Sequence, residues 1–255
     1  MQLAYETDKG AASSARLGLI VLQADETIEM EFKRLINLNG VVVYCTRVPS
    51  GVEVTERTLA AMEVQIPVAA SLLPRAAEFD VIGYACTSGA TIIGSDRVAH
   101  IIHEARPATD SGNFVQTRVT DPLRAVMAAC KALKVQRLGF VTPYVKDVSA
   151  AMRTTLETSG LIISAFGSFE QSEESVVARI SPTSVYEAVL KVGRAALCDA
   201  VFVSCTNVRT LDILEDAERV LGLPVITSNQ ALAWHMLRQA GIVRHIENVG
   251  RLLKI

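Results

Sequence analysis

The chain has 255 residues, half of them hydrophobic, and a formal net charge of −2. This length suffices for one large domain or two ordinary ones with a substantial core. The nearly balanced charge gives no indication of nucleic acid or an anionic membrane surface as a partner. No apolar stretch approaches the roughly 18 residues that a membrane-spanning helix needs. We therefore expect neither a nucleic-acid-binding protein nor a membrane protein.

The N-terminal residues 1–15 carry Glu6, Asp8 and Lys9 and lack the apolar segment of a signal peptide, so we expect a loose leader. The five cysteines are an odd number and show neither disulfide-type nor metal-type spacing. Reduced thiols are the rule in the cytosol. We therefore predict a cytoplasmic protein with reduced cysteines and no metal site.

Strand and helix patterns alternate from residue 16 onward. In the first half they predict strands at 16–23, 40–46, 79–85 and 114–119, helices at 25–37, 55–66, 68–78, 89–104 and 122–133, and a loop at 105–113. We expect Pro67 to bend or break its helical segment. Pro122 suits a first helical turn, with Thr120 or Asp121 as the cap.

The same series repeats in the second half. The patterns predict strands at 137–144, 161–168, 200–204 and 223–227, and helices at 146–158, 183–197, 209–221 and 229–240. Gly160, Gly222 and Gly241 follow three of these helices and are typical stop signals. The segment from Ile242 onward adds a terminal strand or helix.

Matching positions recur at nearly one offset. The separation is 121, 120 and 119 positions for the pairs Arg16 and Arg137, Gly40 and Gly160, and Cys86 and Cys205. A fourth pair, Thr120 and Thr227, is only 107 positions apart, which implies about 13 extra residues in the first half. We interpret this as an internal duplication of a half with four strand–helix units.

Alternating strands and helices of this length predict parallel sheets covered by helices on both faces. The predicted fold class is α/β, with two pseudo-symmetric flavodoxin-like halves that each hold a mainly parallel four-stranded sheet. The expected divisions are a leader 1–15, a first half 16–120, a linking helix 121–134, a second half 135–241 and a C-terminal segment 242–255. A pseudo-twofold axis would bring equivalent strand ends together and place the active site between the halves.

Two cysteines occupy equivalent places in the duplication. Cys86 follows the run DVIGYA, Cys205 follows DAVFVS, and small polar residues come next in both. The carboxyl ends of strands are where open α/β sheets place their sites, and the pKa of a thiol falls at a helix N-terminus. We expect backbone N–H groups at 87–89 and 206–208 to bind a carboxylate. Further donors would come from Thr87, Ser88, Thr206 and Asn207.

Two facing thiols suit one-base, one-acid chemistry, in which one attacks or deprotonates a substrate and the other returns a proton. This chemistry needs no cofactor. A disulfide between the two is an alternative, although less expected in the cytosol. For Cys45, Cys130 and Cys198 we expect small buried hydrophobic residues, because none combines a strand end with a polar turn.

Several motifs resemble a known family. They are ACTSG around Cys86, SCTN around Cys205, VTPY at 141–144, FGSFEQSEESVVARI at 166–180 and LPVITSNQALAWHML at 223–237. Over residues 16–241 the chain resembles the maleate cis–trans isomerase and arylmalonate decarboxylase group of the aspartate/glutamate racemase superfamily, and within it the ectoine-utilisation protein A branch. The resemblance implies a site between two pseudo-symmetric halves and cofactor-independent chemistry at the α-carbon of carboxylates.

The resemblance also implies roles for residues. Cys86 matches the nucleophile of maleate isomerases, Cys205 matches the proton donor, and Tyr144 matches a tyrosine that contacts a substrate carboxylate. Thr87, Ser88, Thr206 and Asn207 fall in the carboxylate-binding turns. Decarboxylases of the group keep only the second-half cysteine, so two cysteines favour an isomerase or racemase. The alternatives are a carboxylate-binding or regulatory protein without turnover and, less favoured, a malonate-type decarboxylase.

The chain departs from the pattern at two positions. Maleate isomerases use asparagines after the first strand and near VARI, where this chain has Asp25 and Glu174. Carboxylates there would repel a dicarboxylate. We hypothesise that Asp25 or Glu174 meets a cationic group on an amine-bearing acid; alternatively, both only cap helices or face water. We expect a small carboxylate as substrate and a homo-oligomer as the assembly.

Overall fold

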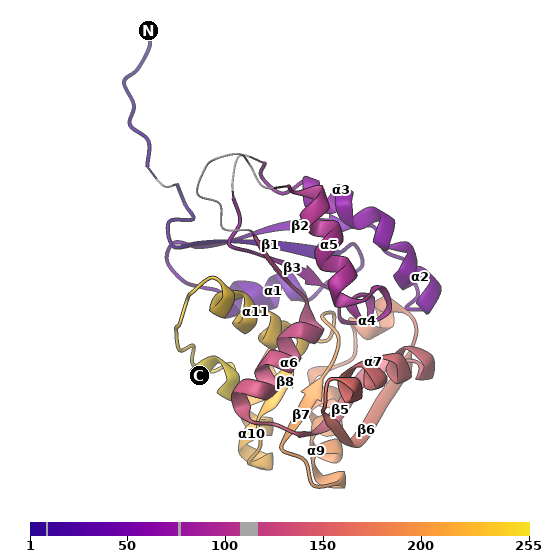
Figure 1. The fold of residues 1–255 in the computed structure, drawn as a ribbon. Helices are drawn as coiled ribbons and strands as arrows, with labels where there is room; N and C mark the ends of the chain where they lie inside the picture. The colour runs from indigo at the N-terminus through magenta and orange to yellow at the C-terminus, as the bar shows by residue number, and fades with distance from the viewer. Residues whose placement is uncertain (9, 76–77, 108–116) are drawn as a thin grey trace.

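The computed structural model describes residues 1–8, 10–75, 78–107 and 117–255, and in them the strands form two four-stranded parallel sheets (Figure 1). The first sheet has the order β2-β1-β3-β4 and consists of β1 (Ala15–Leu22), β2 (Val41–Val48), β3 (Val81–Ala85) and β4 (Arg118–Thr120). The second has the equivalent order β6-β5-β7-β8 and consists of β5 (Arg137–Tyr144), β6 (Ile162–Gln171), β7 (Ala200–Val203) and β8 (Val225–Thr227). The predicted α/β fold with two similar halves is confirmed.

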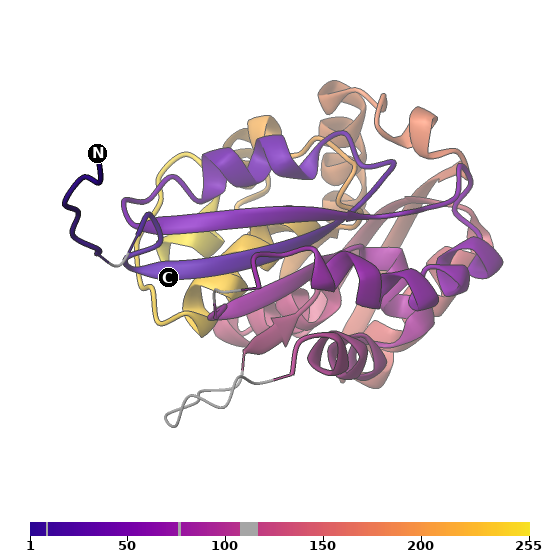
Figure 2. The same ribbon diagram turned by 90° about the horizontal axis from the view of Figure 1, so that it is seen from above.

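Helices flank the strands on both sides, as the view along the first sheet shows (Figure 2). Those of the first half are α1 (Ile28–Leu35), α2 (Glu56–Ala61), η1 (Glu63–Gln65), α3 (Ile66–Ser71), α4 (Thr87–Ile93), α5 (Ser95–Ala105) and α6 (Pro122–Leu133). Those of the second half are α7 (Lys146–Thr158), α8 (Glu174–Val177), α9 (Pro182–Ala195), η2 (Leu211–Ile213), α10 (Leu214–Leu221), α11 (Ser228–Gln239) and η3 (Arg251–Lys254). In the described part of the chain, none is both long and apolar enough to cross a membrane.

An equivalent hydrogen bond holds the start of the first strand in each half. The carboxylate of Asp80 accepts a hydrogen bond from the backbone N–H of Arg16 at 2.7 Å, and Asp199 accepts one from Arg137 at 2.8 Å. In the second half the Arg137 guanidinium adds an ion pair of 2.6 Å, and these hydrogen bonds lower the pKa of Asp199 to about 2. Two equivalent aspartates with one function support the internal duplication.

Two predicted helices are divided differently from expectation. The break expected at Pro67 is wrong: Pro67 lies in the first turn of α3, where a missing N–H leaves no hydrogen bond unmade, and the chain turns earlier, at η1. The helix expected at 89–104 begins at Thr87 and is interrupted at Gly94, which separates α4 from α5 with a φ of +92°. Glycine accepts this conformation readily because it has no Cβ.

Other boundaries also differ. The helix expected at 209–221 is a turn followed by η2, and α10 begins only at Leu214. Cys45 is exposed rather than buried, because β2 is an edge strand. The C-terminal segment forms only the short η3. The predicted loop 105–113 and strand 114–119 fall largely outside the described residues. Within the described residues, β4 covers Arg118–Thr120.

The helix that ends the second half packs on the first sheet. Met236 of α11 is fully buried against β3, where a Cβ added to Gly83 would lie 2.7 Å from its sulfur. The hydroxyl of Thr120, at the end of β4, lies 2.8 Å from Nδ1 of His235 on the same helix. The two halves therefore share one core instead of meeting along a wet surface.

A buried carboxyl group joins the halves near the carboxyl ends of the strands. Glu31 of α1 is 1% exposed, and its Oε1 accepts hydrogen bonds from the backbone N–H groups of Thr210 at 2.7 Å and Leu211 at 3.1 Å. Its Oε2 accepts one from the Asn229 amide at 2.7 Å. The first half thus fixes the turn that follows Cys205.

Glu31→Ala should lower the free energy of unfolding by about 3 kcal/mol, because it leaves several buried donors without an acceptor. Urea denaturation followed by circular dichroism measures the change. Glu29→Ala is the matched control: Glu29 lies on the same helix in an exposed ion pair with Arg47, and its loss should change stability by less than about 1 kcal/mol. Equal effects of the two substitutions would contradict the proposed anchoring role.

Candidate active site

Cys86 ends β3 and caps α4. Its sulfur accepts a hydrogen bond from the backbone N–H of Gly89 at 3.1 Å and lies 3.5 Å from the Ser88 hydroxyl. The side chain is buried, which raises the pKa of the thiol to about 12, while these two donors act in the opposite direction. Cys86 is therefore a neutral thiol at rest, with donors in place for a thiolate.

Cys205 follows β7 in a different local structure. It has a φ of +98°, a region that favours glycine, and its sulfur accepts a hydrogen bond from the backbone N–H of Asn207 at 3.3 Å. Burial raises the pKa of this thiol well above its usual value, and a hydrogen bond with Tyr144 partly opposes the increase. A strained backbone at a buried thiol is typical of a functional site.

A polar chain joins the two cysteines across the halves. The backbone N–H of Cys205 donates to the Ser228 hydroxyl at 3.0 Å, and that hydroxyl lies 2.8 Å from the hydroxyl of Thr87, the residue after Cys86. Thr206 also donates to the carbonyl of Ala85 at 3.4 Å. The structure thus brings the equivalent strand ends together, as the duplication predicts.

Tyr144, at the end of β5, lies close to both sulfurs. It is 2% exposed, and burial raises its pKa well above the usual value, with the negative charge of a Cys205 or Cys86 thiolate adding to the increase. The phenol therefore remains protonated and can donate a hydrogen bond. A donor between two thiols is suitably placed for a bound carboxylate or for developing negative charge.

Asp25 and Glu174 reach the same interior from opposite halves. One oxygen of Asp25 accepts hydrogen bonds from the N–H groups of Thr27 and Ile28, both at 2.8 Å, at the start of α1. The other oxygen is buried without a hydrogen bond of ordinary geometry among the described residues, although the Thr206 hydroxyl interacts with the carboxylate and opposes the rise of its pKa. Oε2 of Glu174 accepts a hydrogen bond from the Asn207 amide at 2.9 Å. Capping of α1 uses one of the two Asp25 oxygens, so the capping alternative does not explain why the other oxygen is buried.

The two acids make this interior unfavourable for additional negative charge. Burial raises the pKa of Asp25 and of Glu174, and their mutual repulsion raises that of Glu174 further. Both acids also raise the pKa of each cysteine. Arg47, which acts on Asp25, binds Glu29 and the backbone carbonyls of 22, 23 and 25 with its guanidinium.

Most side chains predicted to bind substrate already have partners in the protein. Asn207 accepts a hydrogen bond from the N–H of Glu26 at 2.9 Å while its amide holds Glu174, and Thr87 is bound to Ser228. The N–H groups of Gly89 and Asn207 point at sulfur, so they are not open to a carboxylate as expected. The roles of these residues toward substrate stay predictions.

Ser228, Tyr84 and Glu31 were not identified from the sequence. Ser228 could have been found by following the duplication to the end of its fourth strand, where Thr227 matches Thr120.

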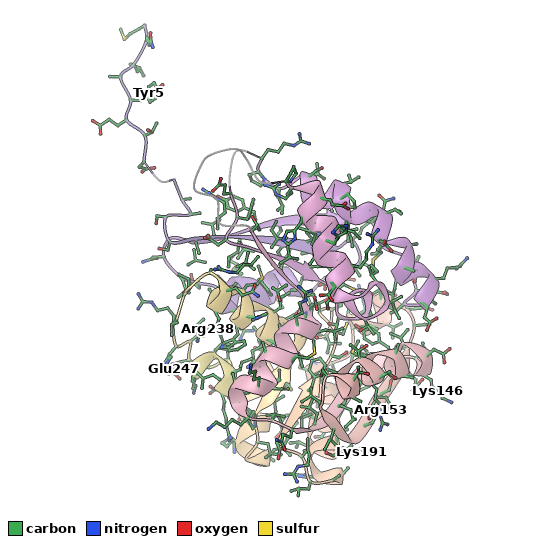
Figure 3. All side chains as sticks on the ribbon, viewed as in Figure 1. Tyr5, Lys146, Arg153, Lys191, Arg238 and Glu247 are labelled. Carbon is green, nitrogen blue, oxygen red and sulfur yellow. The ribbon has the colours of Figure 1, made fainter. Side chains whose placement is uncertain are left out.

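Labelled charged residues such as Lys146 and Lys191 lie on the outer surface (Figure 3). The acids beside the cysteines, by contrast, are inside.

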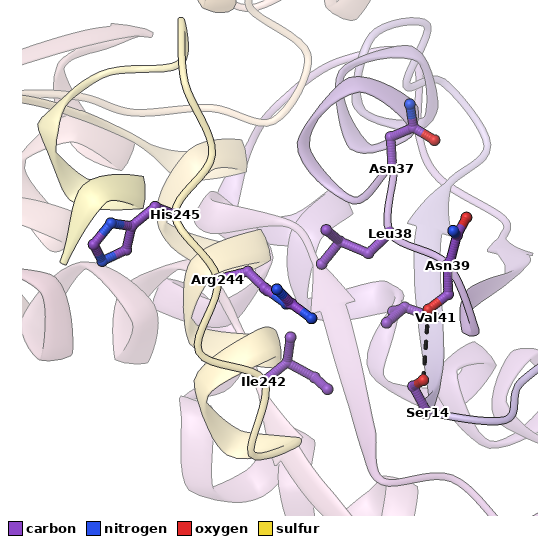
Figure 4. A pocket seen from close by; sticks show the side chains of 8 residues that line it. All are labelled: Ser14, Asn37, Leu38, Asn39, Val41, Ile242, Arg244 and His245. Carbon is purple, nitrogen blue, oxygen red and sulfur yellow. Dashed lines mark hydrogen bonds between the residues drawn. The ribbon is translucent and has the colours of Figure 1, made fainter.

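A separate surface pocket of about 470 Å³ lies elsewhere. It is lined by Ser14, Asn37, Leu38, Asn39, Val41, Ile242, Arg244 and His245 (Figure 4). These residues precede β1, precede or begin β2, or belong to the C-terminal segment, so the pocket lies at the amino ends of these strands. Cys86 and Cys205 lie at the opposite, carboxyl ends.

Comparison with known proteins identifies the family. Residues 59–253 match the arylmalonate decarboxylase family. The chain belongs to this family. A maleate isomerase from Nocardia farcinica is 27% identical over 94% of this chain and 95% of its own length. An arylmalonate decarboxylase from Bordetella bronchiseptica is 30% identical over 46% of this chain and 49% of its own length.

Solved structures of family relatives share the fold. A mutant of the Nocardia farcinica maleate cis–trans isomerase with a covalently bound succinylcysteine intermediate superposes with a TM-score of 0.83 at 28% identity, covering 94% of this chain and 98% of that one. The maleate isomerase Iso from Pseudomonas putida S16 gives 0.84 at 23% identity with the same coverage. The resemblance to maleate isomerases and arylmalonate decarboxylases is confirmed; the ectoine branch stays a prediction.

In this family member Glu174→Gln should change the pH dependence of stability. Because burial raises the pKa of Glu174 in the folded state, its contribution is present below the unfolded pKa and is lost as the pH rises. Relative to wild type, the variant should therefore gain stability between about pH 4 and pH 8, by about 1.4 kcal/mol for each unit of the pKa increase. Urea denaturation across this range measures the difference.

Glu187→Gln on the exposed face of α9 is the control and should leave the pH dependence unchanged. If Glu174→Gln instead lost stability toward about pH 8, the carboxylate would be stabilised by its surroundings, contrary to the structure.

Proposed function

We propose that the protein is a cofactor-independent isomerase or racemase in which Cys86 and Cys205 act together on a small carboxylate. The observation that carries the proposal is the pairing of two buried thiols at equivalent strand ends, joined through Ser228 and both close to Tyr144. The succinylcysteine intermediate of the Nocardia farcinica maleate isomerase supports a thiol that bonds to the substrate in this family.

In a cis–trans isomerisation, the Cys86 thiol first loses its proton to water, and the thiolate adds to one carbon of a double bond. The electron pair moves onto the neighbouring carbon and its carboxylate as an enediolate, to which Cys205 gives a proton. Rotation about the new single bond follows. Cys205 then takes the proton back, the double bond re-forms, and the C–S bond breaks. Every atom is returned and no oxidant or co-reactant is consumed.

In a racemisation, Cys86 removes the α-proton from one face and Cys205 delivers a proton to the other. The same donors serve this route, because the intermediate is again an enediolate. Tyr144 is a neutral donor in both routes.

We further propose that the substrate carries a positive charge, as an amino acid or a related amine-bearing acid of the kind linked to ectoine breakdown. The buried oxygen of Asp25 that no backbone N–H binds and the nearby Glu174 support this proposal, because a cation would compensate two buried acids. Asp25 and Glu174 would instead repel a second carboxylate of the substrate.

Incubation with a panel of small carboxylates in deuterated water tests the reaction. Proton NMR should show isomerisation or deuterium at one α-carbon, and Cys86→Ser and Cys205→Ser should each reduce turnover by about a thousandfold or more while the fold is kept. Cys45→Ser, at an exposed thiol, is the control and should be fully active.

Near-normal turnover in either serine variant would rule out the two-thiol mechanism. Release of carbon dioxide would instead identify a decarboxylase. Tight binding with no exchange of protons would identify a binding protein.

Asp25→Asn and Glu174→Gln together should change substrate preference. The double variant should lose most of its kcat/KM for an amine-bearing acid, by about tenfold to a hundredfold, and accept uncharged analogues relatively better. Glu173→Gln, at the exposed neighbour of Glu174, is the control and should leave the preference unchanged. Rapid turnover of maleate by the wild type, with no amine-bearing acid accepted, would contradict the proposed specificity.

A further inference from the structure

Tyr84 is buried beside the reactive cysteine without an ordinary hydrogen bond. It lies on β3, which ends at Ala85, two positions before Cys86. The ring is 0% exposed, and its hydroxyl has no conventional hydrogen-bond partner among the described residues. A buried tyrosine hydroxyl nearly always has a partner. The unmet donor therefore calls for a structural or chemical reason.

The Cys86 sulfur is beside this hydroxyl. A Cβ added to Gly89 would lie 2.5 Å from the Tyr84 oxygen and 2.9 Å from the Cys86 sulfur, so both atoms border the same small space. The two groups interact, and burial together with a Cys86 thiolate raises the pKa of Tyr84 well above its usual value. The phenol thus keeps its proton while the thiol ionises.

We propose that Tyr84 is a positioning residue for Cys86, whose O–H donates to the sulfur when the thiolate forms. It completes a set of three donors with the N–H of Gly89 and the hydroxyl of Ser88. In the neutral state the thiol sulfur is only a weak acceptor, which accounts for the missing conventional hydrogen bond of the phenol. The inference rests on the proposed role of Cys86 as the reactive thiol.

Comparison of the two duplicated halves supports a role of Tyr84 that is specific to the first half. At the offset of 119 positions that relates the two cysteines, Tyr84 corresponds to Val203 and Gly89 to Val208. The phenol and the glycine that leaves room for it are thus both absent from the second half. Cys205 receives its tyrosine from β5, as Tyr144. Each thiol has a tyrosine, and the two come from different places in the fold.

Alkylation by iodoacetamide at about pH 8 tests the proposal, with the modified peptides quantified by mass spectrometry. A lost hydrogen bond to a thiolate raises the thiol pKa by about one unit or more, and each unit slows alkylation only about threefold because the remaining thiolate is more nucleophilic. Tyr84→Phe should therefore slow alkylation of Cys86 about threefold to tenfold. Cys205 in the same molecules should react at its wild-type rate.

Two further variants sharpen the test. Gly89→Ala keeps the phenol but fills the space that it shares with the sulfur, so it should slow Cys86 alkylation as well. Tyr44→Phe removes a hydroxyl from a ring that packs edge-on against Phe79, and should leave the rate unchanged.

An unchanged Cys86 rate in Tyr84→Phe would overturn the proposal, as would a wild-type Cys86 that does not react at all. A general loss of folding would change the alkylation rates of both Cys86 and Cys205, so it is distinguished from a selective effect on Cys86. Because the assay uses no substrate, an inactive protein with the expected Tyr84 effect would refute the proposed function alone.

Discussion

Two thiols and two carboxyl groups are buried together, and the structure around them limits the free-energy penalty of forming charge there. Desolvation raises the pKa of Cys86, Cys205, Asp25 and Glu174, so the charged form of each is unfavourable. Backbone N–H groups aimed at both sulfurs, the Ser88 hydroxyl beside Cys86 and the Tyr144 phenol beside Cys205 reduce this penalty. The arrangement is ready for charge that appears during a reaction, because its donors are already oriented.

The duplication supplies this arrangement without making its halves identical. The equivalent aspartates Asp80 and Asp199 fasten the first strand of each half in the same way. At the site, however, Cys86 caps a helix, whereas Cys205 has a positive φ and precedes a turn that Glu31 fixes from the other half. Two thiols in different surroundings can take different roles, which one-base, one-acid chemistry requires.

The sequence predicted the order of elements well, because strand and helix periodicity is local and is repeated at a constant offset. It also indicated Cys86 and Cys205, which share a strand end and a polar turn. It did not indicate Ser228 or Glu31, since Thr87 lies 141 positions from Ser228 and Thr210 lies 179 positions from Glu31, and only folding brings them together. The break at Gly94 was missed because one glycine in a helical pattern does not reveal its backbone angle.

The backbone at Cys205 has a consequence for how such proteins diversify. A residue with a side chain held at a φ of +98° destabilises the fold by about 1–3 kcal/mol, whereas glycine would fit there with little penalty. Drift at this position is therefore biased: losing the sulfur by mutation to glycine makes the chain sturdier. The Cys205 side chain therefore has to contribute something that offsets this penalty, as the proposed catalytic role would.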